Sequence, residues 1–274
     1  MRMLSALLIT LLAGLMTTLG ALIVTQQRFL RRGPLSLALA FAAGAMLFLA
    51  FAELVPHGLE MLDHVAEDGA WPLDGRVAFF AAFFVGIALI GLIDRFMPHK
   101  HDSPIAVDEA HDAHERSHGG TLGRSGILLA AIFALHNLPE GFALFFTAEE
   151  QISVGILLAA AIAAHNIPAG IAIAAPIYAS TKSRVKALFW ATAAGMSQLV
   201  GGLIGLLLIS NVLPESFMGV LYGLVAGMMV FIALDELLPA ARRYETKTHR
   251  AVYGLLVGMV IVAVSLLLIG EHHH

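Results

Sequence analysis

The chain has 274 residues, of which 58% are hydrophobic and only 13% are charged. A soluble globular protein of this length needs more polar residues to cover its surface, so the composition predicts an integral membrane protein. The net charge of −4 gives no sign of a nucleic-acid partner, and the absence of cysteine excludes disulfides and thiolate metal ligands.

Eight apolar stretches follow one another along the chain, each about as long as the 20 residues that an α-helix needs to cross a bilayer. They run approximately over 4 to 25, 34 to 56, 77 to 97, 122 to 147, 152 to 178, 187 to 210, 216 to 238 and 251 to 270. We therefore predict an all-α membrane protein with eight transmembrane helices that form one domain over residues 1–274. The first stretch lacks a small-residue cleavage site, so we expect it to be retained. His272–His274 resemble the remainder of a purification tag.

Basic residues predict the orientation of these helices. All Lys and Arg residues except Arg2 and Arg76 lie in the first, third, fifth and seventh connections. Because basic residues concentrate in cytoplasmic loops, these connections are expected inside the cell and both termini outside.

Two pairs of stretches resemble each other in sequence. With an offset of 183, Glu53-Leu54-x-Pro56 in the second stretch aligns with Glu236-Leu237-x-Pro239 in the seventh. The first and sixth stretches match more weakly around Gly14 and Gly195, at an offset of 181. An offset of five helices reverses the direction across the membrane. This predicts an inverted repeat of helices 1–3 and 6–8 around helices 4 and 5, an architecture typical of transporters. For the first and sixth stretches, a likeness by composition alone is an open alternative.

Two short strings stand inside long apolar stretches: His136-Asn137-Leu138-Pro139-Glu140-Gly141 and His165-Asn166-Ile167-Pro168-Ala169-Gly170. In a helix, His136 and Glu140 lie one turn apart on the same face, a spacing that suits metal chelation. Ionisable groups are costly inside a membrane, which favours a functional site. Each proline is expected to open its helix, since it has no N–H for the preceding turn. The alternative is that these polar residues only join helices by hydrogen bonds.

These strings, together with Ala43-Gly44-x-Met46, resemble the ZIP (Zrt/Irt-like) family of divalent metal transporters, close to its bacterial zinc-uptake branch. The resemblance covers nearly all eight stretches. It implies transport of zinc, with iron, manganese and cadmium as further candidates, into the cytoplasm by alternating access. It also implies a 3+2+3 helix arrangement, a homodimer in the bacterial inner membrane, and neither enzymatic activity nor a catalytic cofactor.

The resemblance also implies a set of metal ligands. The main position would use Met46, His136, Glu140 and His165, and a second, adjacent position would use Asn137, Asn166 and Glu140. Relatives usually carry two further carboxylates at the second position, where this chain has Ala169 and Gln198. We therefore expect a single metal position, since two negative charges that would attract a dication are missing.

Charged residues at the helix ends form candidate pathways for the ion. Glu53 and His57 end the second stretch on the expected outer side. Asp94, Asp235 and Glu236 lie at the expected inner side, where pairing with Arg95 or Arg242 is an alternative. A predicted cytoplasmic loop over 98–121 is rich in histidine, which is typical of weak metal binding; its histidines are His99, His101, His111, His114 and His118.

Two other functions remain as alternatives. A metal sensor or binding protein derived from this family would explain Ala169 and Gln198. An intramembrane metallohydrolase is less favoured, because it needs a general base besides its ligands, and no His-Glu-x-x-His string occurs within the eight apolar stretches.

Overall fold

The computed structural model describes residues 2–24, 31–67, 74–96, 119–208 and 215–270, and all of its regular structure is helical. The helices are α1 (Arg2–Val24), α2 (Arg32–Leu49), α3 (Val55–Glu67), α4 (Gly75–Phe96), α6 (Gly119–Glu150), α7 (Ile152–Thr181), α8 (Arg184–Leu208), α9 (Glu215–Phe231), α10 (Leu238–Arg243) and α11 (Arg250–Gly270). Two π-helical segments, η2 (Ala50–Leu54) and η4 (Ile232–Leu237), join α2 to α3 and α9 to α10.

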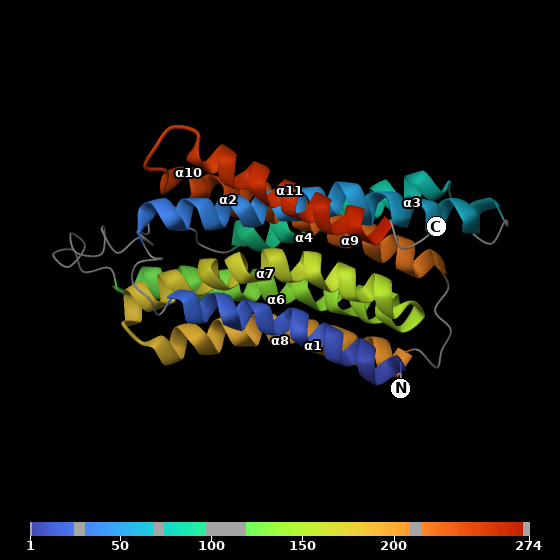
Figure 1. Cartoon of the computed structure of the whole chain (residues 1–274), viewed down its shortest axis with the longest axis horizontal. Coiled ribbons are helices and arrows are strands. Elements are labelled where there is room, and N and C mark those ends of the chain that lie inside the picture. Colours follow the sequence, from blue (N-terminus) through green and yellow to red (C-terminus); the bar gives the residue numbers. More distant parts are fainter. Residues whose placement is uncertain (1, 25–30, 68–73, 97–118, 209–214, 271–274) are drawn as a thin grey trace.

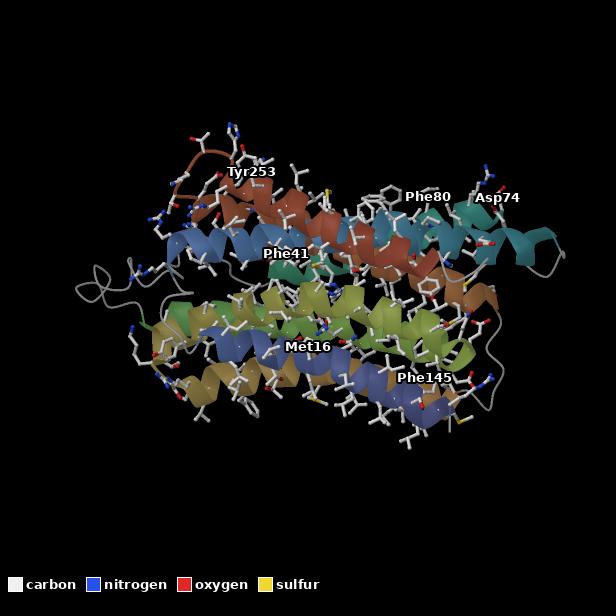
Figure 2. All side chains as sticks on the ribbon, in the orientation of Figure 1. Met16, Phe41, Asp74, Phe80, Phe145 and Tyr253 are labelled. Atoms are coloured by element: carbon white, nitrogen blue, oxygen red, sulfur yellow. The ribbon has the colours of Figure 1, made fainter. Side chains whose placement is uncertain are left out.

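Within the described residues, eight helical stretches are long and apolar enough to cross a membrane, which confirms the predicted all-α membrane fold. The second stretch differs most from its prediction, since it continues past 56 through α3 to Asp63. Many large apolar side chains, such as Phe84 and Leu267, are exposed, as expected for a surface that faces lipid. Figure 2 shows Phe80 and Tyr253 on the outside of the helices.

The helices form two groups (Figure 1). The first group consists of α1, α6, α7 and α8, which pack closely on one another, and the second contains α2, α3, α4, α9, α10 and α11. The two groups meet where α7 packs against α2 and α11 and where α6 packs against α9. One end of the molecule carries α3 and the opposite end carries α10, and we refer to them as the α3 end and the α10 end.

Glycines allow the helices of the first group to approach closely. A Cβ at Gly20 of α1 would collide with the backbone carbonyl of Ile167 in α7, and a Cβ at Gly201 of α8 would collide with that of Leu138 in α6. These two contacts correspond at an offset of 181 between α1 and α8, and so does the mutual contact of Gly14 and Gly195. Small residues thus set the helix spacing, as in other membrane proteins. The grouping into three, two and three helices stays a prediction.

The π-helical segments are at equivalent places in the repeat. The Val55 N–H donates to the carbonyl of Ala50, and the Leu238 N–H donates to that of Ala233. Pro56 and Pro239 follow directly, and neither can donate a hydrogen bond to the preceding turn, which favours the wider winding.

The expectation that Pro139 and Pro168 open their helices was wrong, since α6 and α7 run through both prolines without a break. Each proline removes a single hydrogen bond, and close packing on the neighbouring helices holds the rest of the turn in place.

Candidate metal centre

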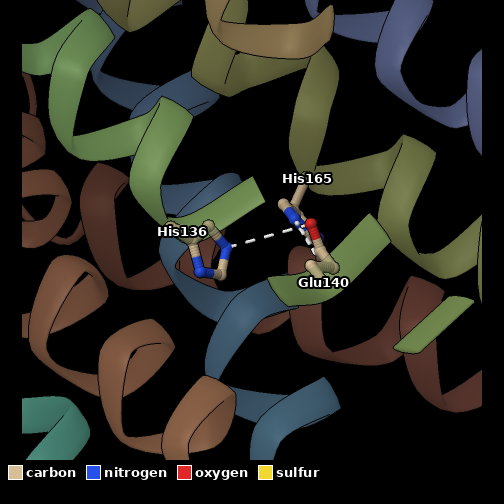
Figure 3. Close-up of side chains that lie close together, drawn as sticks. All are labelled: His136, Glu140 and His165. Atoms are coloured by element: carbon tan, nitrogen blue, oxygen red, sulfur yellow. Dashed lines mark ion pairs between the residues drawn. The ribbon is translucent and has the colours of Figure 1, made fainter. Parts of the chain in front are cut away.

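Two histidines and a glutamate meet between α6 and α7, buried in the interior of the molecule (Figure 3). His136 and Glu140 project from α6, and Nε2 of His136 is 4.0 Å from Oε2 of Glu140. His165 projects from α7, and its Nε2 is 3.3 Å from Oε1 of Glu140. Both histidines are 0% exposed and Glu140 is 4% exposed. One ligand atom from each of the three residues lies within 4.8 Å of the others. The arrangement has the size and composition of a site for one metal ion.

The nitrogen and oxygen atoms of these three side chains make no hydrogen bond to any residue that the structure describes. Buried polar groups are costly without a partner, and buried charges even more so. A dication between the two imidazoles and the carboxylate would provide that partner. Imidazole and carboxylate ligands suit zinc, cadmium and ferrous iron better than magnesium or calcium.

Neighbouring helices hold the two strings in place. A Cβ at Gly141 would collide with the backbone of Gln198 in α8, and a Cβ at Gly170 would collide with the backbone of Thr17 in α1. Only glycine therefore allows α6 and α7 to lie this close to α8 and α1, respectively. Met46 is fully buried on α2, which packs against α7. Its role as a fourth ligand stays a prediction.

A second polar cluster is formed by the residues that follow the two histidines. Nδ2 of Asn137 donates to the carbonyl of Ala194 in α8 at 3.0 Å, and Nδ2 of Asn166 donates to the carbonyl of Ala13 in α1 at 2.9 Å. Asn166 Nδ2 also donates to Oε1 of Gln198 at 3.0 Å. Asn137, Asn166 and Gln198, called the amide cluster below, are at most 1% exposed. Ala169 is buried beside them in α7.

Glu53 and His57 are paired at the α3 end. Nδ1 of His57 lies 3.7 Å from Oε1 of Glu53 and 3.0 Å from its backbone carbonyl oxygen. The His57 side chain is 51% exposed and that of Glu53 is 19% exposed. The pair is therefore open to the surroundings, unlike the buried histidines.

Asp94, Asp235 and Glu236 come together from α4 and η4, with one carboxylate oxygen of each within 4.8 Å of the others. The positions of these residues at the helix ends predicted that all three lie on the same side of the membrane, but not that they are in contact range of one another. The histidines of the 98–121 loop lie outside the described residues, and so do His272–His274.

The sequence of the chain was also compared with known proteins. A family model described as "ZIP Zinc transporter" matches residues 2–126 and 106–266. The zinc transporter ZupT of Corynebacterium glutamicum is 42% identical over 271 residues, which cover 97% of this chain and 99% of the relative. The ZupT proteins of Clostridium perfringens and Stenotrophomonas maltophilia are each 41% identical over 278 and 263 residues. They cover 97% and 96% of this chain and 96% and 95% of the relatives.

The family matched consists of transporters and not of enzymes, which agrees with the buried cluster of two histidines and a glutamate and with the apolar helices. The relatives match over nearly their whole length, so the likeness concerns the complete eight-helix unit and not one motif. The chain therefore belongs to the ZIP zinc transporter family, as its two His-Asn strings and its eight apolar stretches predicted.

Proposed function

We propose that this protein carries divalent transition-metal ions, zinc first among them, across the bacterial inner membrane into the cytoplasm by alternating access. The observation that carries the proposal is the buried convergence of His136, Glu140 and His165 from two helices. Membership of a zinc transporter family and relatives named as zinc transporters support it. Iron, manganese and cadmium are further substrates to test.

In this proposal, Glu140 neutralises part of the charge of the dication, and the two imidazoles replace water molecules of its hydration shell. Met46 provides a thioether as a fourth ligand. Because a thioether and two imidazoles favour softer ions, the centre selects zinc and cadmium over magnesium and calcium.

We further propose that the centre holds one ion. Both hydrogens of the Asn166 amide are engaged, one by the Ala13 carbonyl and one by Gln198 Oε1. Gln198 accepts this hydrogen bond through Oε1, so the amide group that it could turn toward a second ion is Nε2. This group carries hydrogens and repels cations. A glutamate at this position would instead attract them. The amide cluster thus supports a neutral second position that no dication occupies.

The ion would reach the centre from Glu53 and His57 and leave past Asp94, Asp235 and Glu236, with both termini outside. Carboxylates at either end attract cations and raise their local concentration. We also propose a homodimer, as the family resemblance implies.

Uptake of radioactive zinc into vesicles that contain the purified protein tests this function. We expect accumulation with the unmodified chain and near abolition with His136→Ala or Glu140→Ala, because each change removes a ligand. Glu150→Ala provides a matched control, since Glu150 is an exposed carboxylate at the end of the same helix. Normal uptake by the His136 or Glu140 variant would contradict the assignment.

The same experiment separates the alternatives. A metal sensor or binding protein would saturate at a fixed number of ions per chain and would not accumulate zinc in the vesicle. A metallohydrolase would cleave substrate without moving the ion.

A further inference from the structure

A hydrogen bond joins the two helix groups near the α3 end. The Tyr222 hydroxyl of α9 lies 2.9 Å from Oγ1 of Thr147 in α6. Tyr222 is 6% exposed, so the bond is shielded from competing water or lipid head groups. Nearby, Phe142 of α6 and Phe217 of α9 make an edge-to-face contact with ring centroids 5.8 Å apart. The α6–α9 interface therefore combines one polar contact with aromatic packing.

The direction of this hydrogen bond follows from its surroundings. Thr147 Oγ1 also lies 3.0 Å from the carbonyl oxygen of Ala143, which can only accept. The hydrogen of the Thr147 hydroxyl is used there, so Tyr222 donates to Thr147. Tyr222 is anchored within its own group, because a Cβ at Gly58 of α3 would lie only 3.0 Å from the Tyr222 Cβ. The bond thus ties a fixed point of the second group to α6.

The repeat places apolar residues at the corresponding positions of the α10 end. The offset of 183 relates Tyr222 to Leu39 in α2, and the spacing of 29 between the two His-Asn strings relates Thr147 to Pro176 in α7. Leu39 and Pro176 are both buried, and neither has a polar side chain. A side-chain hydrogen bond of this kind can therefore form at the α3 end but not between the corresponding residues of the α10 end.

We propose that the Tyr222–Thr147 hydrogen bond is a latch that keeps the α3 end closed and breaks when the path from Glu53 to the metal centre opens. This inference rests on the proposed alternating access. Two ends built from related helices would close equally well, so a preference for one closed end must come from residues that differ between the repeats. Loss of one hydrogen bond should shift that equilibrium about fivefold toward opening of the α3 end.

Two alanines offer matched reporter positions for this opening. Ala143 in α6 and Ala172 in α7 correspond at the spacing of 29, and they are 3% and 4% exposed. Ala143 lies between Glu140 and Thr147 along α6, on the way to the α3 end. The natural chain has no cysteine, so Ala143→Cys and Ala172→Cys each introduce a single reactive thiol. Its rate of modification by a water-soluble reagent reports the access of water.

The experiment measures these rates in the full-length, metal-free protein in lipid nanodiscs, alone and combined with Tyr222→Phe or Thr147→Val. We expect both changes to raise the rate at Ala143→Cys about fivefold and to leave the rate at Ala172→Cys unchanged or lower. Thr147→Ser keeps the hydroxyl and should leave both rates as they are. Tyr253→Phe makes the same chemical change on an exposed tyrosine of α11 and should also have no effect.

An unchanged rate at Ala143→Cys, or an equal rise at both reporters, would overturn the latch. If Tyr222→Phe does not fold, the comparison of Thr147→Val with Thr147→Ser decides the question. Because labelling needs no metal, the labelling rate can be measured whether or not the protein transports zinc. Failure of the unmodified chain to accumulate zinc would contradict transport, whereas unchanged labelling would contradict only the latch.

Discussion

The candidate metal centre and the amide cluster take neighbouring residues from α6 and α7, but the polar atoms of these residues differ in their hydrogen bonds. Asn137 and Asn166 donate hydrogen bonds to carbonyls of α8 and α1. His136 and His165, one residue earlier, make none to the described residues. The asparagines therefore join helices, whereas the two histidines face only the Glu140 carboxylate. Hydrogen-bond partners, more than residue types, therefore distinguish a structural cluster from a binding cluster.

The largest effect is expected from Glu140→Gln. The change keeps the size of the side chain but removes the one carboxylate that lies between the two imidazoles. We expect zinc uptake to fall to background and zinc binding to weaken at least about a hundredfold, since a neutral amide attracts a dication far less than a carboxylate does. Uptake into vesicles and titration calorimetry measure both quantities. Retention of tight binding would show that the centre lies elsewhere.

The amide cluster should become a metal site when it gains charge. We expect the double variant Ala169→Glu with Gln198→Glu to bind two zinc ions per chain, whereas the natural chain binds one. Two added carboxylates attract the second ion, and the change at Gln198 also removes the N–H groups that repel it. Elemental analysis of the purified protein gives the count. Gln151→Glu, at an exposed position between α6 and α7, is the control. Two tight ions in the natural chain would refute the single-ion proposal.

Stability in the absence of metal should separate the two clusters. Asn166→Ala removes two hydrogen bonds and should lower the free energy of unfolding by about 2 kcal/mol, and Asn137→Ala, which removes one, by about 1 kcal/mol. His136→Leu should change it by less than about 1 kcal/mol, because the imidazole makes no hydrogen bond to the described residues and lies 4.0 Å from the Glu140 carboxylate. Denaturant unfolding in detergent provides these values. A loss for His136→Leu as large as that for Asn166→Ala would contradict the distinction.

The smallest effect is expected outside both clusters. Glu53→Gln should lower zinc uptake about twofold to fivefold at limiting zinc and hardly at all at saturating zinc, because a charge at the α3 end raises the local ion concentration without forming the centre. Uptake measured over a range of zinc concentrations tests this. Glu60→Gln, on the exposed side of α3, is the control. A complete loss with Glu53→Gln would instead make Glu53 part of the transport step.

The main features of the fold and the centre follow from local sequence patterns. Apolar stretches predict helices through their length, and the spacing of His136 and Glu140 places both on one face of α6. His165 could be added because its string repeats the first one. These inferences use residues that are close together in the sequence, or two strings that repeat the same pattern of residues.

Other features depend on which helices become neighbours, and sequence spacing does not reveal this. No pattern marks the carbonyls of Ala13 and Ala194 as acceptors, or Thr147 as the partner of Tyr222. The π-helical turns arise at Pro56 and Pro239, whereas α6 continues through Pro139. A proline removes the same N–H in each case, so the surrounding packing decides whether the winding changes.

The most direct test of the account is an anomalous-scattering map of crystals soaked with cadmium. We expect one strong peak per chain, between Nε2 of His136, Nε2 of His165 and the carboxylate of Glu140, with no peak at the amide cluster. A map without a peak among those three side chains, or with its main peak beside Asn166 and Gln198, would contradict the central claim.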